Sequence, residues 1–162
     1  MAVLDRERDV IVLRIVYDGP PEAGKTTSLR ALAGGLGHTV ESPAEQYGRT
    51  LYFDWLDYTA GRFEGRPIRC QIVSVPGQPE LVQRRLRLLR DADVVVLVGD
   101  SSAGRIEESL ESLRFVARFL ARRAAPQPAV VFQANKRDLP DAVPLKVLRE
   151  RVREVATQTG VI

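Results

Sequence analysis

The sequence predicts an α/β fold: a three-layer sandwich whose mostly parallel sheet carries one antiparallel hairpin at its edge and helices on both faces. Two observations support this prediction. Three short apolar runs rich in β-branched residues are each followed by a helix-like segment, and one pair of strand-like runs is joined by a glycine-containing connection. A chain of 162 residues with 44% apolar residues fits one domain over residues 1–162 with a sizeable core.

The three apolar runs are the expected parallel strands. They read VIVLRIVY at 10–17, DVVVLVGD at 93–100 and AVVFQANK at 129–136. Near-continuous apolar runs of this length are typical of parallel strands that are buried on both faces. The helix-like segments at 25–34, 105–123 and 145–155 follow them, so strands and helices alternate along the chain.

One pair of strand-like runs breaks this alternation. RTLYFDWLDY at 49–58 and RPIRCQIVSV at 66–75 are joined by TAGRFEG, which predicts an antiparallel hairpin at the sheet edge. In the first run, Phe53 and Trp55 alternate with Tyr52 and Asp54. The first interpretation is that one face of this strand packs in the core, and the second is that an exposed aromatic serves a partner.

The charge and cysteine content narrow the class of protein. The 24 basic and 21 acidic residues give a net charge of +3, a surplus too small to indicate a nucleic-acid partner. The densest basic cluster, QRRLRLLR at 83–90, is interpreted as a solvated helix face with its leucines partly inward; a partner or an acidic lipid surface is the alternative. Cys70 is the single cysteine, which excludes an internal disulfide and suits a reducing compartment.

The chain carries none of the common targeting or anchoring patterns. Its first residues, MAVLDRERDV, are charged where a secretion signal is apolar, and no apolar stretch approaches membrane-spanning length. Residue 2 is alanine and the last residues, TQTGVI, are not a prenylation box, so we expect no lipid anchor. We expect a cytoplasmic protein.

The segment GPPEAGKT at 19–26 fits the pattern G-x-x-x-x-G-K-[ST] between an expected strand and an expected helix, and so predicts a phosphate-binding loop. Backbone N–H groups of such a loop and the N-terminus of the next helix surround the phosphates. Lys25 would contact the β- and γ-phosphates, and the hydroxyl of Thr26 would coordinate Mg²⁺. A fortuitous glycine-rich turn is the alternative. The expected nucleotide-binding residues of this segment are Gly19, Glu22, Ala23, Gly24, Lys25, Thr26 and Thr27.

A second motif, NKRD at 135–138, follows the third apolar run and indicates which base is bound. The Asp138 carboxylate can accept from both N1–H and the exocyclic amine of guanine, a pair of donors that adenine lacks. Asn135 would brace the loop and contact N7, and the stem of Lys136 would cover the base. The alternative is a polar turn at a helix start, since Asp-Leu-Pro is itself a common boundary.

In this order, GPPEAGKT, VPGQ and NKRD resemble the motifs of the Ras-like small GTPases, which have the fold of P-loop NTPases. The closer resemblance is to the bacterial cell-polarity and gliding-motility switches of the MglA type. It rests on RTLYFDWL, SVPGQ, DADVVVLVGDSS and NKRDLPDAVP and covers about residues 10 to 145.

The resemblance implies roles for residues of two further segments. Gln78 matches the residue that orients the attacking water, and the N–H of Gly77 would sense the γ-phosphate. Thr50 matches the switch threonine that joins Mg²⁺ in the GTP state. Arg49 matches an arginine that acts on the phosphates from within the same chain; a surface charge at the start of a strand is the alternative. Such an arginine typically contributes about 10³–10⁵ in rate.

Two local features depart from the small-GTPase pattern. Ser74 stands where most small GTPases carry an aspartate that supports magnesium; the MglA-type resemblance implies a hydroxyl residue there, and the loss should loosen magnesium without abolishing it. Pro21 stands where glycine is usual and removes one N–H near the γ-phosphate. The carboxylate of Glu22 must point outward to avoid repelling the nucleotide.

The resemblance also implies elements beyond the fourth motif. In the family a further strand, a loop over the guanine and a final helix follow; here only EVATQTGVI remains after LKVLRERVR, so the closing helix is expected to be missing. The segment 155–157 would replace the base-covering loop, with the N–H of Ala156 meeting the guanine carbonyl.

The sequence thus predicts a GTP- and GDP-binding switch with Mg²⁺ as cofactor and slow GTP hydrolysis. By resemblance, a roadblock-fold dimer would act as its GTPase-activating protein, effectors would bind downstream, and the role would be polarity or motility control. A guanine-nucleotide-binding scaffold without hydrolysis is the main alternative, supported by Ser74 and Pro21. A third interpretation is an adenine-specific P-loop ATPase.

Overall fold

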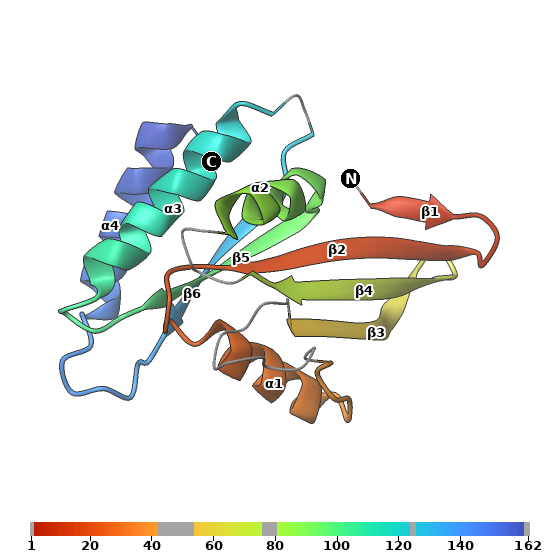
Figure 1. The fold of residues 1–162 in the computed structure, drawn as a ribbon, viewed down its shortest axis with the longest axis horizontal. Coiled ribbons are helices and arrows are strands. Elements are labelled where there is room, and N and C mark those ends of the chain that lie inside the picture. The colour runs from red at the N-terminus through yellow and green to blue at the C-terminus, as the bar shows by residue number, and fades with distance from the viewer. Residues whose placement is uncertain (1, 42–53, 76–80, 124–125, 161–162) are drawn as a thin grey trace.

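The structure is a computed structural model, and it describes residues 2–41, 54–75, 81–123 and 126–160. Within these ranges a six-stranded sheet lies between α1 on one face and α2, α3 and α4 on the other (Figure 1), which confirms the predicted α/β sandwich. The strands are β1 (Val3–Asp5), β2 (Val10–Asp18), β3 (Asp54–Phe63), β4 (Arg66–Ser74), β5 (Val94–Asp100) and β6 (Ala129–Asn135). The helices are α1 (Lys25–Gly35), α2 (Val82–Asp91), α3 (Ile106–Ala121) and α4 (Leu145–Thr159).

The centre of the sheet is parallel. Its order is β3-β4-β2-β5-β6, and β2 pairs in parallel with both β4 and β5, while β5 pairs in parallel with β6. The carboxyl ends of these strands therefore meet at one edge of the sheet, which is where ligands bind in open α/β sheets. The segments that follow β2, β5 and β6 include both predicted binding motifs and the start of α3.

The edge hairpin is present, but its turn is tighter than the sequence prediction. β3 and β4 pair antiparallel as far as Phe63 and Arg66, so most of TAGRFEG is strand. Glu64 and Gly65 form the two-residue connection with φ of 50° and 79°, the left-handed backbone that a type I′ hairpin requires. The strand pairing shifts register between Ala60 and Arg62, and Gly61 between them has a φ of 35°.

The first interpretation, that one face of this strand packs in the core, is confirmed, but Trp55 does not lie on that face. Asp54 and Leu56 face inward and are 4% and 1% exposed, whereas Trp55 points to the other face and is 37% exposed. The strand does pack one face in the core, but the inward positions are the even-numbered ones. The exposed aromatic of the second interpretation is therefore Trp55 itself.

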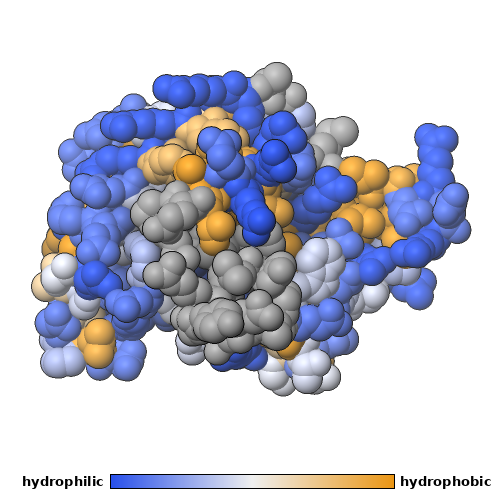
Figure 2. Space-filling view, viewed as in Figure 1, coloured by the Kyte–Doolittle hydropathy of each residue, from blue (hydrophilic) through white to orange (hydrophobic). Residues whose placement is uncertain are grey.

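The sequence prediction lacked β1. Its three residues pair antiparallel with the first residues of β2, and a turn through 6–9 joins the two strands. Val3 and Leu4 stay 50% and 40% exposed. Figure 2 shows hydrophobic surface gathered on this outer part of the sheet, beyond the region that α2 covers.

Each face of the sheet has its own core cluster. On one face α1 contributes Leu29 and Ala33 against β2, β3 and β4, and on the other α2, α3 and α4 pack on β5. The basic cluster at 83–90 is in part a solvated helix face, as predicted: Arg84, Arg87 and Arg90 are exposed and Leu89 is fully buried. Arg85 departs from the prediction, because its side chain turns inward and is 16% exposed. Among the described residues, no helix has the length and apolar character needed to cross a membrane.

Candidate nucleotide-binding site

The loop between β2 and α1 has a backbone that turns repeatedly through the left-handed region. Gly19, Glu22 and Gly24 have φ of 141°, 59° and 96°, and α1 begins at Lys25. A Cβ at Gly19 would lie 2.2 Å from the carbonyl oxygen of Val98, and one at Gly24 would lie 2.2 Å from the side-chain nitrogen of Asn135. At Gly19 the contact is with backbone, so glycine is required by close approach as well as by conformation. At Gly24 a Cβ would displace the Asn135 amide, and the left-handed φ also favours glycine.

Lys25 folds back over this loop. Its Nζ donates to the carbonyl oxygens of Gly19 and Pro20 at 2.9 and 2.7 Å, and the residue is 7% exposed. Burial lowers the pKa of the Lys25 ammonium from 10.5 to about 8; the carboxylate of Asp18 opposes this shift and the guanidinium of Arg85 adds to it. A buried ammonium inside a ring of left-handed backbone is a site for a polyanion.

The Glu22 side chain points away from the loop, as expected. Its carboxylate pairs with the guanidinium of Arg105, just before α3, at 2.7 Å, and its side chain is 78% exposed. Arg105 also donates to Glu108 at 2.9 Å. The pair offsets the negative charge of Glu22 next to the expected phosphate-binding loop.

Thr26, the expected magnesium ligand, donates its hydroxyl to the carboxylate of Asp54 at 2.5 Å. Asp54 opens β3 and lies directly opposite Ser74 in the antiparallel register with β4, and both residues are buried at 4% and 5% exposure. The sheet register therefore places a carboxylate from the neighbouring strand beside the position where Ser74 replaces the usual aspartate.

These oxygens fit a magnesium ion. Mg²⁺ takes oxygen ligands, dehydrates reluctantly, and is commonly held by one or two protein groups together with waters and substrate phosphates. Thr26 supplies a hydroxyl and Asp54 a carboxylate next to it, while no group of three or more His, Cys, Asp or Glu residues gathers anywhere in the described part of the chain. The arrangement suits an ion held in part by phosphate.

Asn135, the first residue of the second motif, joins that motif to the loop. Its side-chain amide donates to the carbonyl oxygen of Ala23 at 2.8 Å. Two residues earlier on β6, Gln133 donates to the hydroxyl of Ser28 on α1 at 2.8 Å. These contacts join segments more than 100 residues apart, so the expected phosphate-binding and base-binding motifs lie side by side.

Lys136 has a left-handed backbone with φ of 56°, and its ammonium pairs with Asp100 at 2.7 Å. Asp100 ends β5, is 3% exposed, and also accepts from the N–H and hydroxyl of Ser102 at 2.9 and 2.8 Å. Burial by itself would raise the pKa of Asp100, but the hydrogen bonds from Lys136 and Ser102 outweigh it and lower the pKa below its ordinary value. The lysine stem is thereby fixed beside the turn, and the neighbouring Asp138 remains exposed to solvent.

The other expected site residues divide into three groups. Ala23 is fully buried beneath the loop, and Thr27 is exposed on the first turn of α1. Ala156 lies inside α4, which runs to Thr159, so the expected loop at 155–157 is a helix instead. Inside a helix the N–H of Ala156 is committed to the carbonyl four residues earlier, and it is not offered to a base. Arg49, Thr50, Gly77 and Gln78 lie outside the described residues.

Sequence reasoning missed the supporting charges of the site, namely Asp18, Asp54, Asp100 and Arg105. Each lies at or next to the end of a strand or helix that borders the loop. A sequence signal did exist for two of them: Asp18 and Asp100 each end a near-continuous apolar run, where a buried carboxylate needs a partner. The identity of that partner depends on the fold.

Comparison with known proteins gives one extensive relation. No protein-family model matches the chain. The mutual gliding-motility protein MglA of Myxococcus xanthus (strain DK1622) is 34% identical over 156 residues, which cover 93% of this chain and 80% of that protein. Translation initiation factor IF-2 of Rhodospirillum rubrum is 39% identical over 75 residues, but these cover 46% of this chain and 8% of that protein. Together with the fold and the two adjoining motifs, the relation to MglA shows that the chain belongs to the Ras-like small GTPases of the MglA type.

Proposed function

We propose that the protein is a guanine-nucleotide switch that binds GTP and GDP with Mg²⁺ and hydrolyses GTP slowly. One observation carries the proposal: the amide of Asn135 holds the carbonyl of Ala23 at 2.8 Å, so that a base-reading turn and a phosphate loop form one continuous site. Membership of the MglA-type family supports the same conclusion.

Within this site each end of the nucleotide has its own chemistry. The loop amides from Gly19 to Thr27 and the ammonium of Lys25 would hold the phosphates, and Asp138 would accept from the two donors of guanine. Asn135 would brace the loop, and Lys136, fixed by Asp100, would cover the base.

Thr26 would be the direct protein ligand of Mg²⁺, with Thr50 joining it in the GTP state. Asp54 would act on the hydroxyl of Thr26 and on metal-bound water from β3, the role that residue 74 lacks. When bound, the ion would neutralise charge that develops on the β- and γ-phosphates.

Hydrolysis would depend on the two segments that carry Arg49 and Gln78. Gln78 would orient the attacking water and Arg49 would stabilise the charge on the transferred phosphoryl group. The segments 38–50 and 74–90 would change conformation when the γ-phosphate leaves, and Gly77 would report its presence. A roadblock-fold dimer would accelerate turnover by placing Arg49 and Gln78.

A single-turnover measurement of phosphate release from bound GTP tests this proposal. We expect slow release from the wild-type protein, faster release with an activator, and loss of release in Gln78→Ala. Gln83→Ala is the matched control, since Gln83 is an exposed glutamine on α2. Release that is unchanged in Gln78→Ala would refute the assignment of that residue.

The second function to weigh is a guanine-nucleotide-binding scaffold. Ser74 in place of aspartate and Pro21 in the phosphate loop both favour it, because each would weaken the hydrolytic geometry more than it would weaken binding. Mass spectrometry of the nucleotide released from purified protein and the phosphate measurement separate the two. Bound GTP that is never cleaved, with or without activator, would establish the scaffold.

The cellular role proposed is control of cell polarity or motility in the cytoplasm, with effectors that bind the GTP state. It is supported by the relation to a gliding-motility protein. Affinity capture with GTP-loaded and GDP-loaded protein would test it. We expect partners that bind only the GTP-loaded form, and equal capture by both forms would contradict a switch.

A further inference from the structure

Asp18 is a buried carboxylate immediately before the phosphate loop. It ends β2, is 1% exposed, and accepts a hydrogen bond from the N–H of Gly19, the first residue of the loop. Its negative charge is among the causes that act on the pKa of Lys25. A buried anion at this place is unfavourable for a loop that binds polyphosphate, unless the anion is neutralised.

The neutralising charge comes from α2. The guanidinium of Arg85 binds both carboxylate oxygens of Asp18, with Nε donating at 2.9 Å and Nη2 at 2.7 Å. This is the bidentate geometry of strong Arg–carboxylate pairs, and the Arg85 side chain is only 16% exposed. The two residues are 67 positions apart in the sequence.

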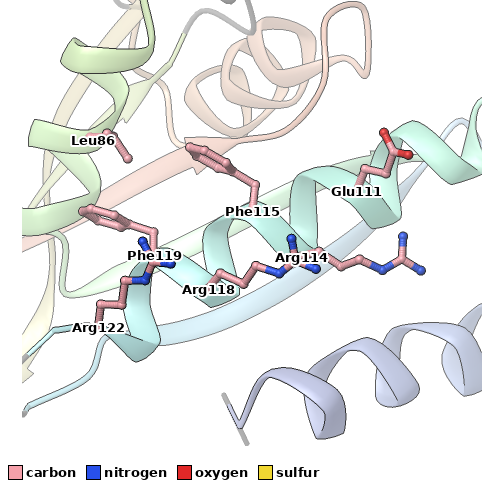
Figure 3. A pocket seen from close by; sticks show the side chains of 7 residues that line it. All are labelled: Leu86, Glu111, Arg114, Phe115, Arg118, Phe119 and Arg122. Carbon is pink, nitrogen blue, oxygen red and sulfur yellow. The ribbon is translucent and has the colours of Figure 1, made fainter.

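α3 holds Arg85 in place from the other side. The hydroxyl of Ser112 accepts from its Nη2 at 2.9 Å, and the guanidinium carbon lies 4.4 Å from the centre of the Phe115 ring. Phe115 projects from α3 toward α2, next to the groove that Leu86 and Phe119 also line (Figure 3). Arg85 therefore has one carboxylate, one hydroxyl and one aromatic face as partners, and little freedom.

We propose that Arg85 is a positioning residue for nucleotide binding, which neutralises Asp18 from α2 and so keeps the phosphate loop in a form that accepts polyphosphate. This inference rests on the proposed nucleotide-binding function. In this proposal α2 acts on the loop electrostatically, through the ion pair of Arg85 with Asp18. Because α2 lies in the segment proposed to switch, any displacement of α2 would expose bound phosphate to the charge of Asp18.

The test is the affinity of fluorescent GDP and GTP for the wild type and three variants at fixed magnesium and ionic strength. Arg85→Gln should weaken GDP binding by about tenfold to a hundredfold, because it leaves a buried carboxylate unpaired beside the phosphates. The double variant Asp18→Asn/Arg85→Gln should recover affinity to within about threefold of wild type, since neither charge is then present. Arg87→Gln, an exposed arginine on the same helix, is the matched control and should bind as wild type does.

Ligand charge distinguishes positioning from a merely structural role. If Asp18 acts on phosphate, the loss in Arg85→Gln should be largest for GTP, smaller for GDP, smaller again for GMP, and absent for guanosine. A general loss of folded protein would weaken all four ligands by the same factor, and that result would overturn the inference. Thermal unfolding of each variant shows whether it is folded, and Arg85→Lys, which keeps the charge, provides a second variant should Arg85→Gln not fold.

The two proposals fail in different ways. Wild-type protein that binds no guanine nucleotide would overturn the proposed function and this inference with it. Wild-type binding together with an unchanged affinity in Arg85→Gln, or no recovery in the double variant, would overturn the inference alone.

Discussion

Thr26 and Asp54 share a hydrogen bond of 2.5 Å, which joins the first turn of α1 to the first residue of β3. The contact depends on the hairpin, because β3 brings Asp54 opposite Ser74 at the end of β4. Residue 74 carries a hydroxyl, and residue 54, opposite it on the adjacent strand, carries a carboxylate. If the proposed function holds, Asp54 on β3 would supply the magnesium-supporting carboxylate that residue 74 does not.

The first prediction concerns this carboxylate. Asp54→Asn should raise the magnesium concentration needed to retain GDP by about tenfold, the effect typical of losing a group that orients a metal ligand. The measurement is the GDP dissociation rate during a magnesium titration. Asp57→Asn is the control, since Asp57 lies on the same strand but pairs with Arg69 at 2.7 Å. Equal magnesium dependence in both variants would contradict the role of Asp54.

The second prediction concerns pH. In the folded, nucleotide-free protein burial lowers the pKa of Lys25 to about 8, from 10.5. Between these values the unfolded chain binds more protons than the folded one, so the free energy of unfolding should rise with pH over about pH 8 to 10.5 through this group. Below pH 8 Lys25 is charged in both the folded and the unfolded chain, so its contribution to the free energy of unfolding no longer changes with pH. Chemical denaturation of wild type and Lys25→Met across this range should show the rise in the wild type alone.

Nucleotide binding should have the opposite dependence on pH. Bound phosphate favours the charged ammonium, so binding takes up a proton once the pH exceeds the pKa of the free site. GDP affinity should be flat below pH 8 and about tenfold weaker at pH 9 than at pH 7. Lys25→Met should bind more weakly at every pH and show no such decline. A wild-type profile parallel to that of Lys25→Met would refute the assigned pKa.

The fold could be predicted from sequence because its signals are local. The apolar composition of the runs that form β2, β5 and β6 is enough to predict that these strands are buried. In the same way, the glycines between β2 and α1 predict the turns of the loop. Asp54 carries no such signal. Whether it points toward Thr26 or away depends on the register of the hairpin, and a slip of one residue would turn it to the other face of the sheet.

The same limit explains the missed ion pairs and the missed helix end. Asp18 and Arg85 are 67 residues apart, and only the packing of α2 over the end of β2 brings them together. Ala156 was placed in a loop by resemblance to the family, yet the local sequence continues the helix to Thr159 and ends it at Gly160, with φ of 69°. Helices commonly end at a glycine in the left-handed region, so Gly160 predicts the end of α4 better than the family resemblance does.

The third prediction uses the close approach at Gly24. A Cβ at this position would lie 2.2 Å from the side-chain nitrogen of Asn135, so Gly24→Ala must displace the residue that joins the two motifs. Its left-handed φ of 96° adds strain. We expect loss of measurable GDP binding by calorimetry. The control is Gly34→Ala in α1, where a Cβ meets nothing within 4 Å. That variant should bind normally and gain about 0.5–1 kcal/mol in stability; if it too loses GDP binding, the effect cannot be assigned to the contact with Asn135.

The fourth prediction concerns the choice of base. Asp138 is exposed beside Lys136, whose pairing with Asp100 at 2.7 Å fixes the turn without involving the Asp138 carboxylate. Asp138→Asn should therefore leave the turn intact while it exchanges an acceptor of two hydrogen bonds for a group that also donates. Guanine nucleotides should bind at least about tenfold more weakly, and xanthine nucleotides, which carry a carbonyl where guanine has its amine, should bind better than they do to wild type.

Competition against fluorescent GDP or XDP measures this exchange, and the same titration with ATP tests the adenine alternative. Wild type should discriminate strongly against ATP, because adenine offers no pair of donors to a carboxylate. Asp141→Asn is a suitable control, as Asp141 is an exposed aspartate three residues further on. Should ATP compete with GTP on wild type, or should Asp138→Asn keep its guanine preference, the carboxylate of Asp138 would not be the group that selects the base.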